Sequence, residues 1–319
     1  MSWTNPPTEN RSIAILGAGV LGRRIGAVWA AGGYTVHLRD PDAQQLEAAR
    51  EYIQEHARDY KADVRSSDLR VETFEELAPA VRTAFVVVEC VPEQLPIKQE
   101  TFSALERLAP ADAVLTTNSS SYKSREMSRH LAPATRARVL NMHYMMPPRN
   151  RVVELMTCGD THEAIFPWLL DMLKRLTMVP VRARKESTGF VINRIWAAIK
   201  REALMELAEG VATPEDLDAV WHEMFVKSEI PPCGGMDLVG LDTVSFIEQH
   251  YIKERGLQTR GSSTSCRSTS TKGGSATRRR TRADCTHRSR SNLDNECSDW
   301  GKTSWLIGGE LLVTSVLLR

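Results

Sequence analysis

The stretch SIAILGAGVLGRRIGAVWAAGGYTVHLRD, residues 12–40, opens with five β-rich residues and runs directly into a glycine-rich turn. Gly17, Gly19 and Gly22 have the spacing G-x-G-x-x-G, after a predicted strand at 12–16 and at the start of a predicted helix. The first glycine permits the tight turn, the second lets the backbone approach a pyrophosphate, and the third lets helix and strand pack closely. The pattern therefore predicts a dinucleotide-binding βαβ unit.

The acid that such a unit uses to hold the ribose is also present. Asp40 follows the second predicted strand, 35–39, where a carboxylate can accept hydrogen bonds from the adenosine ribose hydroxyls. The same charge would repel a 2′-phosphate, so the sequence favours NAD over NADP. Val20 and Leu21 lie at the helix N-terminus that receives the phosphates, and we expect both to contact the cofactor.

Short β-rich runs alternate with amphipathic helical stretches through the first part of the chain. The predicted strands are 12–16, 35–39, 84–88, 113–117 and 138–142, with helical stretches at 42–60 and 95–108 between them. Runs of this kind suit strands that are buried on both faces of a parallel sheet. Two further runs, 152–157 and 179–184, are expected to extend the sheet. Residues 11–186 are therefore predicted to form a doubly wound α/β domain of Rossmann type, after a flexible N-terminus at 1–10.

Beyond this domain the pattern becomes helical and then polar. Helices are predicted at 188–210, 213–225 and 242–256, which gives a smaller all-helical domain over 187–258. Residues 259–319 are rich in Ser, Thr and Arg, a composition that predicts a disordered tail. A change of reading frame or a retained intron near codon 258 is an alternative origin for this segment.

Composition narrows the class of protein. The 319 residues are 42% hydrophobic and 25% charged, with a net charge of +1, so nothing in the overall balance recruits nucleic acid or an acidic membrane. The six cysteines form no C-x-x-C pair, which favours free thiols in a reducing compartment and no metal site. The N-terminus has no apolar signal segment, and the sequence predicts a cytoplasmic protein without a membrane span.

The candidate chemistry lies in MHYMMPPRNRVVELM, residues 142–156. Of the eight histidines, His143 is the one at the carboxyl end of a predicted strand, where open α/β sheets bind their ligands. Glu154 lies in the next apolar run. An alcohol dehydrogenase needs a base with a pKa near neutrality and a carboxylate that orients it. The alternative is a buried core histidine with an outward-facing glutamate.

Two other polar positions interrupt apolar surroundings. The segment TTNSSSYKS, residues 116–124, follows another predicted strand, so its hydroxyls either reach the same crevice or cap the next helix. Asn193 lies within the apolar stretch 189–196. A buried Asn needs hydrogen-bond partners, which makes it an interdomain contact or a substrate contact.

Together these pieces resemble the L-3-hydroxyacyl-CoA dehydrogenase family over about residues 11–256. The residues that carry the likeness are GAGVLGRRIG (17–26), Asp40, VVECVPEQLPIK (87–98), TNSSS (117–121), MHYMMPPRNRVVELM (142–156), STGFVINR (187–194) and MDLVGLD (236–242). The resemblance implies an N-terminal NAD domain and a helical domain that forms a homodimer when it is complete. It also implies reversible oxidation of a 3-hydroxyacyl-CoA, a reaction of fatty acid metabolism.

The resemblance also implies roles for individual residues. His143 matches the general base and Glu154 the residue that holds it. Ser120 matches the residue that binds the substrate oxygen and contacts the cofactor, and Asn193 the one that orients substrate and base. The cofactor contacts beyond the fourth strand of the family correspond to Glu93 and Lys98, and Lys98 is expected to place positive charge near a ribose or phosphate.

The chain departs from the family pattern at several points. Met146 stands where the family usually has an Asn, and Met cannot make the same hydrogen bonds. The helical domain is shortened relative to the family. These departures leave two alternatives open: a dehydrogenase of a small hydroxy acid or a sugar acid, as in the lambda-crystallin type, and a non-catalytic NAD-binding remnant.

Overall fold

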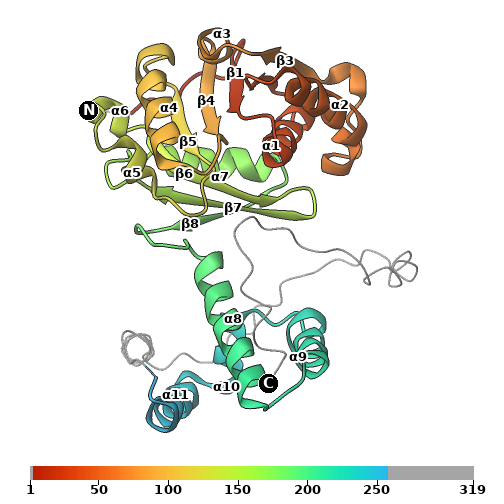
Figure 1. Cartoon of the computed structure of the whole chain (residues 1–319), viewed down its shortest axis with the longest axis vertical. Helices are drawn as coiled ribbons and strands as arrows, with labels where there is room; N and C mark the ends of the chain where they lie inside the picture. Colours follow the sequence, from red (N-terminus) through yellow and green to blue (C-terminus); the bar gives the residue numbers. More distant parts are fainter. Residues whose placement is uncertain (1–2, 258–319) are drawn as a thin grey trace, which may run out of the picture. The chain divides into compact units, whose positions relative to one another are not determined.

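The computed structural model describes residues 3–257 and contains one eight-stranded sheet in the order β3-β2-β1-β4-β5-β6-β7-β8 (Figure 1). The strands are β1 (Ser12–Leu16), β2 (Thr35–Arg39), β3 (Arg70–Phe74), β4 (Ala84–Glu89), β5 (Val114–Thr117), β6 (Val139–Met146), β7 (Asn150–Thr157) and β8 (Val179–Ala183). Every neighbouring pair is parallel except β6 and β7, which are antiparallel. The predicted doubly wound α/β fold is confirmed.

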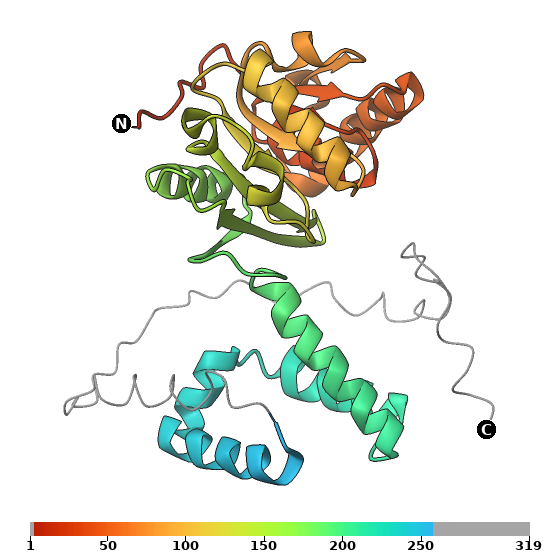
Figure 2. The same cartoon turned by 60° about the vertical axis from the view of Figure 1, so that its left-hand side comes forward.

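Helices cover both faces of this sheet (Figure 2). They are α1 (Val20–Ala31), α2 (Ala43–Tyr60), α3 (Leu77–Val81), α4 (Leu95–Leu108), α5 (Ser124–Ser128), α6 (Pro133–Arg136) and α7 (Ile165–Arg175), with a short 3-10 turn at Ser66–Asp68. Ile13 and Ile15 of β1 pack in one apolar cluster with α1, α2 and α7. Ala14 and Leu16 pack in the other cluster, with α3, α4 and α5. This alternation explains the unbroken apolar run of β1, because both of its faces are covered.

Some elements were not predicted from the sequence. Strand β3 lies at the sheet edge, and none of its five residues is buried, so it lacks the apolar run that marks the central strands. The helices α3, α5 and α6 have only four or five residues each, too few to show a helical period. Their positions depend on contacts with the sheet and not on a pattern of their own.

The antiparallel pair β6–β7 is the part of the sheet that positions the candidate chemistry. Its register places His143 directly opposite Glu154. The turn between the strands contains a cis peptide bond between Pro147 and Pro148. The Pro147 carbonyl accepts hydrogen bonds from Arg24 at 3.1 Å and from Tyr60 at 3.2 Å, which attach this turn to α1 and α2.

The helical part consists of α8 (Ile192–Glu209), α9 (Pro214–Trp221), a π-helix at His222–Lys227, α10 (Pro232–Val239) and α11 (Leu241–Arg255). By its contacts the chain divides into two units, Met1–Val220 and a second that begins at Trp221. The predicted helices at 188–210 and 242–256 are observed, whereas the stretch 213–225 divides between α9 and the π-helix, and α10 was not predicted. Thr213 caps α9 as expected, since its hydroxyl accepts from the Asp216 amide at 3.2 Å.

The sequence also led to expectations about a disordered tail, membrane spans, metal sites and cysteines. The disorder predicted for 259–319 lies outside the described residues. Within residues 3–257, no helix is both long enough and apolar enough to cross a bilayer, and no group of His, Cys, Asp or Glu side chains is arranged to hold a metal ion. The three cysteines of this range, Cys90, Cys158 and Cys233, are free thiols.

Candidate functional site

The glycine-rich turn between β1 and α1 has the geometry that its spacing predicts. Gly17 has a φ of +104°, a conformation that L-residues rarely adopt. A Cβ at Gly22 would overlap the Gly17 carbonyl oxygen, whereas a Cβ at Gly19 would meet nothing within 4 Å. Helix α1 begins at Val20, and no side chain caps it. Its first amides are therefore open toward the space beside Gly19, as a phosphate site requires.

Asp40 lies beside this turn at the end of β2. One carboxylate oxygen accepts the Ala18 amide at 2.8 Å and the other accepts the Asp42 amide at 3.0 Å. Each oxygen keeps a further lone pair for a ribose hydroxyl. The neighbouring Arg39 points its guanidinium at the Glu75 carbonyl, 3.1 Å away. The carboxylate therefore belongs to the dinucleotide turn, while the adjacent cation is engaged elsewhere.

His143 and Glu154 are in contact. The distance from His143 Nδ1 to Glu154 Oε2 is 3.1 Å, and the two residues are 7% and 1% exposed. The alternative of an outward-facing glutamate is therefore excluded. Within residues 3–257 the other ring nitrogen, Nε2, has no hydrogen-bond partner, so it is available to exchange a proton with a substrate.

The second oxygen of Glu154 is also occupied. Oε1 accepts the backbone amides of Val191 and Ile192, each at 2.9 Å, where α8 begins. Burial by itself would raise the pKa of Glu154. The hydrogen bonds from His143 and from the two amides outweigh it and hold the pKa below its usual value. Glu154 is therefore an ionised carboxylate that joins the imidazole to the first turn of α8.

A second buried histidine shows what a structural role looks like. His37 of β2 is 7% exposed, and its Nδ1 lies 2.9 Å from the Ala80 carbonyl and 3.2 Å from the Ser12 hydroxyl. Both neighbours belong to the apolar packing between β1, β2 and α3. The carboxylate that faces His37 is that of Glu72, which lies 3.7 Å from Nε2 and is exposed, whereas the carboxylate beside His143 is buried.

The loop that follows β5 approaches His143 through Asn118. The side-chain oxygen of Asn118 accepts the Tyr144 amide at 2.8 Å, so the loop is attached to β6 next to the histidine. Ser119 is buried, donates its hydroxyl to Glu93 and accepts the Tyr122 amide at 2.9 Å. Ser120 is half-buried, and its hydroxyl has no partner among residues 3–257. Of the two, Ser120 is the serine left free to bind a ligand.

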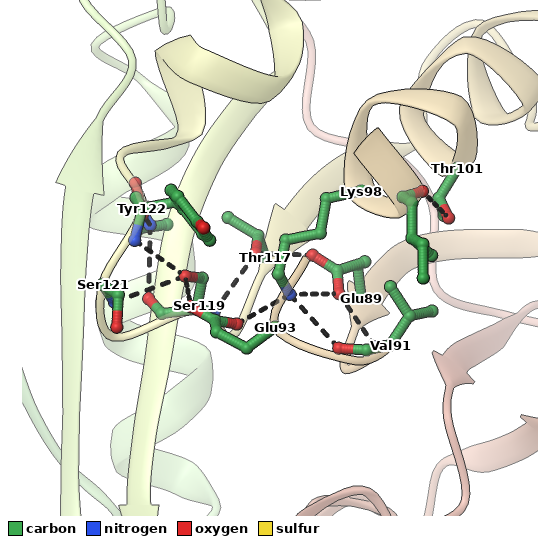
Figure 3. A network of polar contacts seen from close by, with 11 residues as sticks. Glu89, Val91, Glu93, Lys98, Thr101, Thr117, Ser119, Ser121 and Tyr122 are labelled. Carbon is green, nitrogen blue, oxygen red and sulfur yellow. Dashed lines mark hydrogen bonds and ion pairs between the residues drawn. The ribbon is translucent and has the colours of Figure 1, made fainter. Parts of the chain in front are cut away.

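An ion-pair network around the buried Lys98 and Glu89, with the exposed Glu93 at its edge, connects this loop to β4 and α4 (Figure 3). Lys98 is 1% exposed, and its ammonium lies 2.8 Å from Glu89, 3.0 Å from Glu93 and 3.2 Å from the Val91 carbonyl. Thr117 donates to the other oxygen of Glu89 at 2.6 Å. Burial alone would lower the pKa of Lys98, but the two carboxylates hold it above its usual value. All three N–H donors of Lys98 are therefore engaged within the protein, not presented on the surface as positive charge.

Ser119 connects the loop after β5 to this network through hydrogen bonds to Glu93 and Tyr122. We expect Ser119→Ala to lower the free energy of unfolding by about 1–3 kcal/mol. The substitution leaves the Tyr122 amide and one oxygen of Glu93 without their partner. Chemical denaturation of both proteins measures the difference. Ser121→Ala is the matched control, because Ser121 lies in the same loop and is exposed. Equal losses in the two variants would contradict the role given to Ser119.

The remaining expected site residues, Asn193 and Met146, have fewer contacts. Asn193 is half-buried in the first turn of α8 and lines a hollow of about 790 Å³ with Gly189, Phe190 and Arg194. No hydrogen bond joins it to His143, so its orienting role stays a prediction. Met146, at the end of β6, is 44% exposed.

Sequence reasoning missed several groups of the site. They are the Phe190 ring, the amides of Val191 and Ile192, the side chain of Asn118 and the carboxylate of Glu89. The amides carry no sequence signal because every residue except proline has one. Phe190 lies within an apolar stretch in which any member could have been the one facing the histidine.

Comparison with known proteins assigns both parts of the chain to related families. Residues 12–187 match the family described as 3-hydroxyacyl-CoA dehydrogenase, NAD binding domain. Residues 189–280 match 3-hydroxyacyl-CoA dehydrogenase, C-terminal domain, a match that runs past the last described residue.

The individual relatives have names that refer to different proteins and reactions. The 3-hydroxyacyl-CoA dehydrogenase-like protein LAM1 of Cochliobolus heterostrophus is 46% identical over 119 residues, 37% of this chain but only 25% of that protein. The lambda-crystallin homolog of Rattus norvegicus is 32% identical over 225 residues, 66% of this chain and 68% of that protein. A crystal structure of 5-formyl-3-hydroxy-2-methylpyridine 4-carboxylic acid 5-dehydrogenase, described as an NAD+-dependent dismutase, has a TM-score of 0.69 at 26% identity and covers 78% of this chain and 82% of that one.

Proposed function

This chain belongs to the 3-hydroxyacyl-CoA dehydrogenase family, and from that premise we propose that it interconverts a 3-hydroxyacyl-CoA and the 3-ketoacyl-CoA. Its cofactor is NAD, which the N-terminal domain binds. The open amides of α1 and the carboxylate of Asp40 fit the pyrophosphate and ribose of that cofactor. We extend the proposed cofactor contacts to Val20, Leu21 and Glu93, with Lys98 acting through Glu93.

In the proposed mechanism His143 accepts the substrate hydroxyl proton at Nε2. Glu154 holds the opposite Nδ1–H and stabilises the imidazolium that forms. Ser120 donates a hydrogen bond to the substrate oxygen and Asn193 orients the substrate. The chemistry that bound NAD supplies is acceptance of the hydride. In the reverse direction the imidazolium returns the proton to the ketone oxygen.

One observation supports this function above the others: the buried contact between His143 and Glu154, which lie opposite each other within β6 and β7 and not at the end of a strand as the sequence predicted. A structural histidine would need no ionised carboxylate on its inner nitrogen. The contact also weighs against a non-catalytic remnant, because a buried ionised carboxylate costs desolvation energy and has no structural need to face an imidazole.

The test is oxidation of NADH in the presence of acetoacetyl-CoA, followed by loss of NADH absorbance. We expect turnover that requires the CoA thioester. If the protein binds NADH but turns over no 3-ketoacyl-CoA of any chain length, the proposed substrate class is wrong.

A second candidate is a small hydroxy acid or sugar acid as substrate. It is favoured by the similarity to the pyridine carboxylate dehydrogenase and the lambda-crystallin homolog, and by Met146 in place of the family Asn. Assaying NAD reduction with a panel of hydroxy acids alongside 3-hydroxyacyl-CoA separates the two. Faster reduction with a free acid than with any thioester would favour this candidate.

Asp40→Asn is expected to weaken NAD binding by about tenfold or more and to raise the relative use of NADP. The charge that receives the ribose hydroxyls is removed, and so is the repulsion of a 2′-phosphate. Titration of protein fluorescence with NADH and NADPH measures both affinities. Asp42→Asn makes the same charge change two residues later, where the side chain caps α2, and serves as the control. An unchanged NADH to NADPH ratio in Asp40→Asn would contradict the ribose contact.

We also propose a cytoplasmic homodimer that acts in fatty acid metabolism. No residue of α8, α9, α10 or α11 is buried, and their exposed apolar side chains include Trp196, Trp221 and Phe246. A second copy would cover such surface. Sedimentation of the full chain tests this, and a monomer at micromolar concentration would oppose it.

A further inference from the structure

The turn formed by residues 189–192, the start of the helical segment, encloses the His143–Glu154 pair. Phe190 is 3% exposed, and its ring centre lies 5.3 Å from that of His143 at an interplanar angle of 36°. The amides of the next two residues donate to Glu154 at 2.9 Å each. The same turn therefore contacts the imidazole through a side chain and its carboxylate partner through the backbone.

We propose that this 189–192 turn is a positioning element for the base, with Phe190 as its positioning residue, and that the turn disfavours the protonated form of the His143 imidazole. The proposal rests on the proposed function in giving His143 the role of base. The protonation of His143 can nevertheless be measured without any substrate.

Two physical effects of the turn act in the same direction. The Phe190 ring covers the imidazole and excludes water, which disfavours the charged form. The two amides donate hydrogen bonds to Glu154 and place the positive end of the α8 dipole near the pair. Glu154 therefore stabilises an imidazolium less than a carboxylate without these two hydrogen bonds would. Without the turn, Glu154 alone would bias His143 toward the protonated form.

The other charged groups on neighbouring elements have partners of their own. Arg182 of β8 pairs with Glu163 at 2.7 Å, and Arg194 of α8 bonds to the Ser187 hydroxyl at 3.4 Å. Lys98, beyond β5, is enclosed by its two carboxylates. On β6 and β7 the charged group in contact with His143 is Glu154. The Phe190 ring and the Glu154 carboxylate are the groups in direct contact with the imidazole.

A substitution at Gly189 can shift the backbone amides of Val191 and Ile192 while the Phe190 ring is kept. Gly189 has a φ of +78° and Phe190 a φ of +52°. A Cβ at Gly189 would have ordinary contacts of 3.4 Å, so the cost of Gly189→Ala is conformational and not steric. Gly210, at the other end of α8, has a φ of +71° and open space around it. Gly210→Ala therefore imposes the same strain on the same helix, away from the base.

The experiment is an NMR titration of the histidine side chains in the full-length protein, with His143→Gln used to assign the resonance. We expect Phe190→Ala to raise the pKa of His143 by about 0.5–1 unit and Phe190→Leu, which keeps an apolar cover, to change it little. Gly189→Ala is expected to raise it as well, whereas Gly210→Ala leaves it in place. The resonances of His37 and His162 serve as internal references and should not move.

Two results would overturn the proposal. One is a His143 pKa in Phe190→Ala equal to that of the unaltered protein. The other is a shift in Gly210→Ala as large as in Gly189→Ala, which would mean general loosening of α8. If Phe190→Ala does not fold, the comparison of Gly189→Ala with Gly210→Ala decides alone. Because the titration needs no turnover, a protein inactive toward every acyl-CoA would defeat the proposed function without moving these shifts.

Discussion

His143→Gln lowers kcat by about 10²- to 10⁴-fold while NADH binding stays unchanged, if the histidine is the base. Gln has about the size of the imidazole and can hydrogen-bond to Glu154, but it cannot accept the substrate proton. The Phe190 ring and the amides of α8 keep their other contacts, so the fold should persist. Steady-state kinetics with NADH and a 3-ketoacyl-CoA, together with fluorescence titration of NADH, measure the two quantities separately.

His130→Gln is the control for this change. His130 is exposed, and its Nε2 lies 2.7 Å from the Ser103 hydroxyl on α4. It should lose no activity. If His143→Gln keeps full kcat with a saturating substrate, proton transfer does not pass through His143 and another group must act as the base.

The cofactor half of the site could be predicted from the sequence because each of its requirements is local. Gly17 and Gly22 are needed by the turn itself, one for its positive φ and the other for its contact with the Gly17 carbonyl. Asp40 follows from the length of one βαβ unit. The central strands could be located for a similar reason, since a strand buried on both faces must be apolar throughout.

The catalytic half depends on contacts that no local pattern encodes. His143 and Glu154 are 11 residues apart, and they meet because β6 and β7 form an antiparallel pair within an otherwise parallel sheet. The sequence indicated both residues but left open whether they touch. Phe190 and the α8 amides come from a segment 36 or more residues further on, and their role depends on where α8 begins relative to the sheet.

For Lys98 the sequence indicated the right residue but not the groups around it. The sequence placed a lysine after β4 and suggested a positive charge near the cofactor. In the structure Glu89 lies beneath it and Glu93 beside it, so the charge is neutralised inside the protein. Because Glu89 ends a strand of apolar residues, its inward direction became clear only once the pairing of β4 and β5 was known.

Glu154→Gln is expected to lower kcat by at least about 10²-fold while the protein stays folded. A carboxylate has two acceptor oxygens, and Glu154 uses one for His143 and the other for two amides of α8. The Gln side chain has a single oxygen. If that oxygen stays with the amides, its NH₂ group faces Nδ1 and drives the ring proton to Nε2. The nitrogen that should accept the substrate proton is then already protonated.

The pH dependence of Glu154→Gln gives a second test of the same role, independent of the size of kcat. Loss of the carboxylate charge destabilises the imidazolium, so the pKa of His143 should fall and the acidic limb of the rate profile should move to lower pH, opposite to Phe190→Ala.

The free energy of unfolding depends on the protonation of Glu154 itself. Because the fold lowers the pKa of Glu154, its contribution is present above the ordinary carboxyl pKa and is lost as the pH falls through the folded value. The difference in unfolding free energy between the two proteins should therefore shrink in acid, as denaturation at neutral and acidic pH can measure. Glu47→Gln, which breaks the exposed pair with Arg50 on α2, should change neither the rate nor its acidic limb. An acidic limb that stays in place in Glu154→Gln would mean that the carboxylate does not act on the base.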